Sequence, residues 1–217
     1  ASEIKNMVNS VKKGRGAFVT GKCDQYHSGE PLSAISEAFG EICHRVAQDK
    51  SLSLCSEIEA ALRAELHDEV YLLAQIVPNL KEITTLQSQP SKTSDNTNSD
   101  ARQAKLNYAF RVLTRVMSSY FSPLVLCFDD LQWADSSSLE IIERLVSDAR
   151  NKSSLMIIGC YRSNEVGRTH ILSKTIGALT EMNNELVNLT QIQLGNLGKD
   201  EVNEALMALL RIDDKSQ

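Results

Sequence analysis

The sequence predicts an α/β fold in which helices cover both faces of a parallel sheet, giving three layers. Two continuous apolar runs, 124–128 and 155–161, have the length of strands that are buried on both faces. Segments with a helical apolar period lie between and around these runs. Buried strands that alternate with amphipathic helices are typical of parallel sheets, because parallel strands need long crossover connections.

The composition is that of an ordinary globular protein. Its 217 residues fit one domain, or one domain and the start of another, and 42% are hydrophobic and 24% charged. A net charge of -5 argues against a dedicated nucleic-acid surface. No apolar run approaches the ~18 residues of a membrane span. The five cysteines lack paired spacing, so we expect reduced thiols in a cytoplasmic protein.

The first part of the chain predicts a helix, a strand and a second helix. An apolar face over 4–11 ends at the Lys-Lys-Gly of 12–14, which is a typical helix end. Residues 17–20 are expected to form a short strand, and 24–31 are rich in turn residues. The second helix has one apolar face, made by Ile35, Phe39, Ile42 and Val46.

An insertion of about 48–104 is expected before the first buried run. Its apolar stripe predicts one helix over 56–77, which Pro78 ends. Residues 87–103 contain no aliphatic residue larger than Ala, and this predicts a flexible loop. A helix over 104–120 then leads into the buried strand.

Alternating elements continue after that strand. Ser137 and Glu140 fit a capping box, with Ser137 as the cap of a helix that reaches residue 149. The second buried strand, 155–161, follows, and then a helix over 173–182. The spacing thus predicts another strand–helix unit of the parallel sheet.

The end of the chain has a different pattern. Residues 185–194 alternate loosely and are compatible with one further strand. Residues 196–217 are amphipathic and helical in period. We therefore expect a core domain over 1–195 and the start of a second, helical domain over 196–217.

Two adjacent carboxylates end the first buried run. Asp129 and Asp130 cannot be core residues, because burying an unpaired charge is too costly, so they must lie at the carboxyl edge of the sheet. Magnesium prefers hard oxygen ligands, and Asp129 suits that role, while Asp130 would act on an attacking water. The alternative is that both aspartates cap the next helix or pair with lysines.

Four blocks of the sequence resemble one family. FDDLQWADSSSLEII is similar to the Walker B region of the STAND branch of AAA+-like P-loop ATPases, the signal-transduction ATPases with numerous domains. IIGCYRSNEV resembles the family's following strand, GAFVTGKCDQYHSGEPLSAISEAF its second strand and helix, and IQLGNLGKDEVNEALMALL the start of its helical lid. The blocks occur in the expected order, and the insertion is not covered well.

The resemblance implies roles for three residues. Asp129 would be the magnesium-side aspartate, and Asp130 the second acidic residue. Aspartate at this second position is usual for the STAND branch and suggests slow, switch-like hydrolysis. Arg162 would be the sensor that responds to the γ-phosphate. The alternative for Arg162 is a surface ion pair with Glu165, which is worth little energetically. Trp133 is expected to pack over the sheet edge.

The phosphate half of such a site is expected to lie elsewhere. Gly16–Cys23 nearly matches G-x-x-x-x-G-K-[ST], but its interior is strand-forming and it is followed by a turn. Its last residue is a thiol, which is a poor partner for magnesium. The resemblance places this segment on the second strand. We therefore expect the P-loop strand upstream of Ala1, and weak or no ATP binding by these residues alone.

The sequence leads to one main functional hypothesis and two alternatives. The main one is an ATP- and magnesium-dependent switch module, a fragment of a multidomain signalling protein with kinase or cyclase domains and a nucleotide-dependent oligomer. One alternative is a non-catalytic scaffold with a degenerate site. The other is an origin-recognition-like DNA-binding ATPase, and the net negative charge of the chain argues against it.

Overall fold

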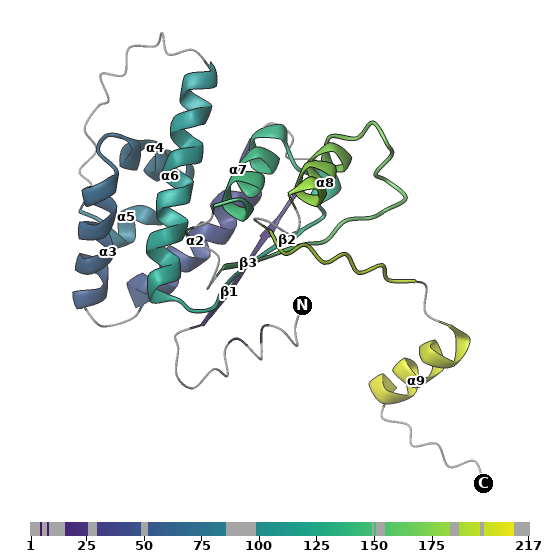
Figure 1. The fold of residues 1–217 in the computed structure, drawn as a ribbon. Helices are drawn as coiled ribbons and strands as arrows, with labels where there is room; N and C mark the ends of the chain where they lie inside the picture. The colour runs from purple at the N-terminus through teal and green to yellow at the C-terminus, as the bar shows by residue number, and fades with distance from the viewer. Residues whose placement is uncertain are drawn as a thin grey trace. The chain divides into compact units, whose positions relative to one another are not determined.

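The computed structural model contains a parallel sheet with flanking helices, which confirms the predicted fold class (Figure 1). Two compact units divide the chain, 1–187 and 188–217, and each is described by itself. The described residues are 5, 8, 16–25, 30–48, 52–85, 99–148, 150, 155–182, 187–195 and 198–210.

Three parallel strands form the sheet in the order β1 (Ala17–Lys22), β2 (Leu124–Asp129) and β3 (Leu155–Gly159). Lys22 is the register partner of Asp129, and Phe128 is that of Gly159. All three strands therefore end at the same edge, and this edge positions the candidate site.

The central strand β2 is buried, whereas its neighbour β3 is not. The first five residues of β2 are buried, as the continuous apolar run predicted. The residues of β3 are half-buried or exposed, and Met156 is 50% exposed. Among the described residues, β3 pairs only with β2, so its outer edge carries no further strand.

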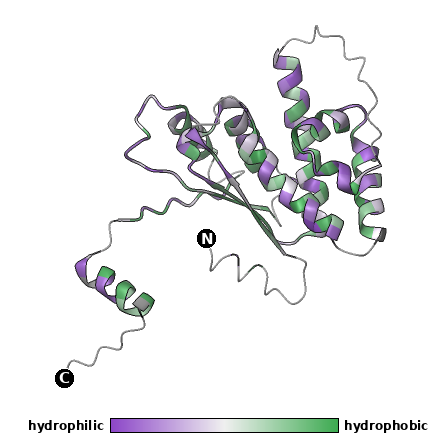
Figure 2. Ribbon diagram, turned by 180° about the vertical axis from the view of Figure 1, so that it is seen from behind, coloured by the Kyte–Doolittle hydropathy of each residue, from purple (hydrophilic) through white to green (hydrophobic). Residues whose placement is uncertain are grey.

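Helices pack on the sheet through one large core. α2 (Ser33–Gln48) covers β1, and α7 (Ser136–Val146) packs between α6 (Ser99–Tyr120) and α8 (Ile171–Glu181). Alternate strand residues such as Val19 and Leu126 belong to this core. The opposite face holds a smaller cluster of Val8, Phe18, Val125 and Cys127. Figure 2 shows the apolar residues gathered along the strands.

The insertion folds into a group of helices rather than the single helix expected over 56–77. α3 (Leu52–Glu65), α4 (Glu69–Ile76) and the short α5 (Leu80–Ile83) precede α6. The apolar stripe runs through the break between α3 and α4, so periodicity could not reveal it. The break lets both helices pack against α6.

Other boundaries also differ from the expectations. α6 begins at Ser99, so the end of the expected loop is helical; residues 86–98 lie outside the described residues. β3 ends at Gly159, and α8 begins at Ile171. The strand expected over 185–194 is wrong for its described part, since only Val187 makes an isolated bridge. Of the first expected helix only residues 5 and 8 are described, and both are helical.

The second unit contains α9 (Lys199–Leu210), which carries both hydrophobic and hydrophilic residues (Figure 2). Leu206 and Leu209 are exposed within it. That this helix begins a lid domain stays a prediction. A search of the described residues finds no helix with the length and apolar character of a membrane span.

Candidate functional site

The carboxyl edge of the sheet gathers charged side chains from three segments. The Nζ atom of Lys22, at the end of β1, lies 3.7 Å from Oδ2 of Asp130. The Nε atom of Arg162, after β3, lies 3.9 Å from Oδ1 of the same carboxylate. The structure thus brings Asp130 and Arg162, two of the residues that the sequence singled out, together at this edge. Lys22 was not singled out by the sequence, although its place at the end of a predicted strand could have indicated it.

Asp130 has a left-handed backbone, with φ 54° and ψ 41°. For a residue with a side chain this conformation costs about 1–2 kcal/mol, although aspartate tolerates it better than most. It turns the chain from β2 into the 3₁₀ helix η2 (Leu131–Trp133). The Leu131 N–H then donates to the carbonyl of Cys160 at 2.9 Å, which fixes the turn to the end of β3.

Gln132 is buried directly behind the carboxylate. Its Nε2 donates to Oδ1 of Asp130 at 3.1 Å, and its Oε1 accepts from the Arg162 N–H at 3.2 Å. In the sequence, Gln132 stood out only as part of the block FDDLQWADSSSLEII. Its burial depends on the contact with Arg162, 30 residues away, so no local pattern indicated a buried, paired amide.

Asp129 is exposed at the end of β2, and its Oδ1 accepts the backbone N–H of Asp130 at 3.0 Å. No group of three or more metal-binding side chains occurs in the described part of the chain. Magnesium keeps several waters and takes one or two carboxylates, so a single exposed aspartate oxygen fits it.

Residues 17–22 are a strand and not a phosphate loop, as expected. Gly21 is required by packing, because a Cβ there would overlap the carbonyl oxygen of Ala34 in α2. Burial, and then the charges of Asp135, Asp130, Asp129 and Glu37, raise the pKa of the Cys23 thiol to about 11. Cys23 is therefore a neutral thiol at neutral pH and a poor ligand for a hard cation.

A cavity of about 780 Å³ opens at this edge. Its lining is mostly polar and is made by Lys22, Cys23, Asp24, Gln25, Asp130, Trp133, Arg162 and Glu165. Trp133, which we expected to pack over the sheet edge, is 41% exposed and lines this cavity at that edge. Arg162 also pairs with Glu165 at 3.2 Å, so the surface ion pair considered above exists beside the contact with Asp130.

Asp135 ties the acidic segment to the start of α2. It is the N-cap of α7, because its Oδ1 accepts the Ser138 N–H at 3.0 Å; the expected cap at Ser137 is wrong. Its Oδ2 accepts the Leu32 N–H at 3.1 Å. Leu32 itself is left-handed, with φ 68°. The Asp135 carboxylate thus accepts from two backbone segments, one oxygen for each, whereas Ser137 lies within α7.

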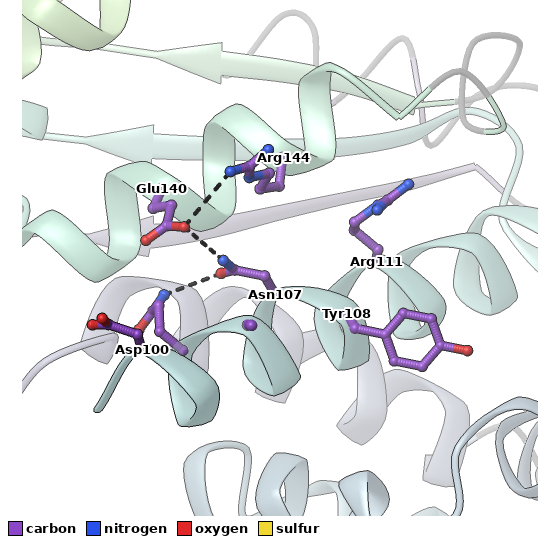
Figure 3. Close-up of a pocket in the computed structure, with 8 residues that line it drawn as sticks. Asp100, Asn107, Tyr108, Arg111, Glu140 and Arg144 are labelled. Carbon is purple, nitrogen blue, oxygen red and sulfur yellow. Dashed lines mark hydrogen bonds and ion pairs between the residues drawn. The ribbon is translucent and has the colours of Figure 1, made fainter. Parts of the chain in front are cut away.

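A second cavity, of about 400 Å³, lies between α6 and α7 (Figure 3). Gln103 donates to Asn107, and Asn107 donates to Glu140 at 2.8 Å. Arg144 lies 4.0 Å from the same Glu140 carboxylate. These groups satisfy one another, and none comes from the sheet edge.

A buried carboxylate lies close to this second cavity. Oδ2 of Asp148 accepts a hydrogen bond from Nε of Arg111 at 3.0 Å, and Nε of Arg115 lies 3.7 Å from the same oxygen. Burial alone would raise the pKa of Asp148. The hydrogen bonds from Arg111 and the Arg150 N–H, with the two guanidinium charges, outweigh burial and hold this pKa below its usual value.

Comparison with known proteins agrees with this geometry. A family profile described as "AAA ATPase domain" matches residues 4–158, more than half of the chain. "Hybrid signal transduction histidine kinase G" of Dictyostelium discoideum is 30% identical over 131 residues. The match covers 59% of this chain and 4% of that protein, so the chain spans a small part of this relative. No solved structure matches significantly.

Proposed function

Because this chain belongs to the AAA ATPase domain family, we propose that it is the metal-and-water half of an ATP-hydrolysing switch of the STAND type. The observation that carries the proposal is the cluster at the carboxyl edge of the sheet. Two adjacent aspartates end the central strand, and cations from both neighbouring strands approach the second one. Ligands of open α/β sheets bind at this edge.

Each residue has a chemical role in this proposal. Asp129 would hold Mg²⁺, which neutralises phosphate oxygens, through one carboxylate oxygen or a water. Asp130 would orient the attacking water or take its proton. Arg162 and Lys22 would leave Asp130 and bind the γ-phosphate, where a fixed cation stabilises the charge of the transition state.

The phosphate loop would come from outside the described segments. β1 and β3 are the two edge strands among the described residues, but they differ in what covers them. The Thr20 and Lys22 N–H groups of β1 donate to Glu41 and Glu37 of α2 and most of its side chains are buried, whereas the side chains of β3 are half-buried or exposed. A strand added along β3 would end at the same sheet edge, next to Arg162. A loop that follows that strand would then deliver phosphate-binding amides to the cavity.

The likeness to a hybrid histidine kinase supports a signalling context. We infer a nucleotide-operated module of a multidomain protein that has kinase or cyclase domains and assembles with nucleotide. Nucleotide binding would order one arrangement of the domains, and hydrolysis would release it. A cytoplasmic location and the absence of nucleic-acid binding stay predictions.

One titration tests the proposal. Fluorescent ATP with Mg²⁺ is added to residues 1–217 and, in parallel, to the natural protein with the sequence that precedes them. We expect weak or no binding by residues 1–217, and tight, Mg²⁺-dependent binding and hydrolysis by the longer protein. Tight binding by residues 1–217 would revive Gly16–Cys23 as the phosphate loop. No binding by either would favour the non-catalytic scaffold.

A further inference from the structure

Gln132 is a buried amide with both ends in use. Its side chain lies in the interior, with the residue 4% exposed, and it is not among the groups that line the cavity at the sheet edge. It therefore cannot touch a ligand in that cavity. Any effect that it has on chemistry must act through the two groups that it binds, Asp130 and Arg162.

The orientation of this amide is fixed by its partners. The backbone N–H of Arg162 can only donate, so the atom facing it must be the Gln132 oxygen. The amide nitrogen then faces the Asp130 carboxylate, which accepts. A flipped amide would place donor against donor and oxygen against carboxylate. Glutamine thus satisfies both ends in one orientation.

The amide assigns different tasks to the two oxygens of Asp130. Oδ1 is held by Gln132, with Arg162 Nε nearby at 3.9 Å. Oδ2 is approached by Lys22 from the cavity side. The oxygen that is left for a water is therefore Oδ2, and Gln132 fixes the direction in which it points.

The same amide joins the ends of two strands. Gln132 contacts Arg162 after β3, and its neighbour Leu131 donates to Cys160 in that segment. Two hydrogen bonds thus hold η2 against the residues that follow β3. A displacement of the Arg162 backbone therefore acts directly on the support of the Asp130 carboxylate.

We propose that Gln132 is a positioning residue that couples Asp130 to Arg162, so that a phosphate bound by Arg162 and the carboxylate that handles water are set together. This inference rests on the proposed function. Gln132 would raise turnover without contributing to the binding of nucleotide.

Two substitutions separate the two ends of the amide. Gln132→Met keeps the approximate volume and removes both hydrogen bonds. Gln132→Glu keeps an acceptor for the Arg162 N–H but removes the donor to Asp130. Gln103→Met is the matched control, because Gln103 makes one side-chain hydrogen bond on α6, to Asn107, away from the sheet edge.

The measurements are steady-state ATP hydrolysis by the natural protein with the complete site, and hydrogen exchange of the Arg162 amide. Both Gln132 variants should lower kcat by about tenfold or more with KM changed less than about twofold, the pattern of a group that acts only on the transition state. Exchange at Arg162 should rise in Gln132→Met and stay slow in Gln132→Glu. Gln103→Met should change neither quantity.

The following outcomes decide whether Gln132 couples Asp130 to Arg162. A kcat loss no larger than that of Gln103→Met, or unchanged Arg162 exchange in Gln132→Met, overturns the coupling. If Gln132→Met does not fold, kcat and KM of Gln132→Glu decide. If the unsubstituted protein hydrolyses no ATP, the proposed function fails, and Arg162 exchange alone decides whether Gln132 holds this segment.

Discussion

Lys22 and Asp130 end neighbouring strands, and the Nζ atom of Lys22 lies 3.7 Å from Oδ2 of Asp130. The lysine side chain is 66% exposed, so solvent screens the pair and its contribution to stability is small. A weak, exposed pair exchanges partners easily. The contact therefore suits a cation that can move from a carboxylate to a phosphate.

Asp130→Asn tests the role assigned to the acidic pair. In the natural protein with the complete site, we expect ATP binding to persist and hydrolysis to fall by about 100-fold or more, because a lost general base costs that much. The measurement is phosphate release beside equilibrium binding of ATP. Asp100→Asn, on α6, is the control and should hydrolyse normally. Unchanged hydrolysis in Asp130→Asn would remove Asp130 from the mechanism.

Lys22→Met tests whether the β1 cation reaches phosphate. A hydrogen bond to a charged group is worth about 1.5–3 kcal/mol, so the Kd of ATP should rise by about tenfold or more. Lys105→Met on α6 serves as control. Equal affinities of the two variants would show that Lys22 pairs with Asp130 and does nothing else.

Asp135→Ala tests the link between α7 and the segment before α2. The substitution removes the helix cap and the acceptor of the Leu32 N–H. We expect the free energy of unfolding to fall by about 1–3 kcal/mol, and Asp135→Asn to recover much of this. Urea unfolding measures both. A loss as large in Asp135→Asn would contradict the capping role.

Gly21→Ala tests the packing of α2 on β1. A methyl group would overlap the Ala34 carbonyl oxygen, so the free energy of unfolding should fall by about 3 kcal/mol. Gly177→Ala is the control, because a Cβ there meets nothing within 4 Å and alanine favours a helix. In thermal unfolding, the melting temperature of Gly21→Ala should lie below that of the natural protein, and the melting temperature of Gly177→Ala should lie above it.

Asp148 gives a pH dependence of known sign. The pKa of the Asp148 carboxyl is held below its ordinary value of 3.8 in the folded protein, so the unfolded chain takes up protons first as the pH falls. The contribution of Asp148 to stability is fully present above pH 3.8, and it is lost as the pH falls through the lower pKa of the folded protein. Urea unfolding at several pH values should show a weaker acid loss in Asp148→Asn than in the control Asp100→Asn.

The sequence predicted the sheet well because buried strands are continuous apolar runs. The run at 124–128 marked β2 except its last residue, and the run at 155–161 marked all of β3 but extended past its end at Gly159. Two adjacent carboxylates could only lie where β2 ends. The short run at 17–20 located β1 in the same way, although the strand extends to Lys22.

The sequence failed where tertiary contacts decide. The stripe over 56–77 continues through the break between α3 and α4, so periodicity alone could not divide it. Asp135 caps α7 through a local bond to the Ser138 N–H, but its second bond, to Leu32 103 residues away in the chain, could not be predicted from a local pattern. The task of Gln132 depends on Arg162, in the segment after β3, and no local pattern contains that contact.

The open side of β3 has a consequence for handling the protein. Leu155–Gly159 is a charge-free, hydrophobic segment whose outer backbone groups find no strand among the described residues. Such an edge is a template on which other chains add, and it lacks the lysines and prolines that usually discourage this. Residues 1–217 expressed alone should therefore self-associate as their concentration rises. Yield and colloidal stability then depend on what covers this edge rather than on the core.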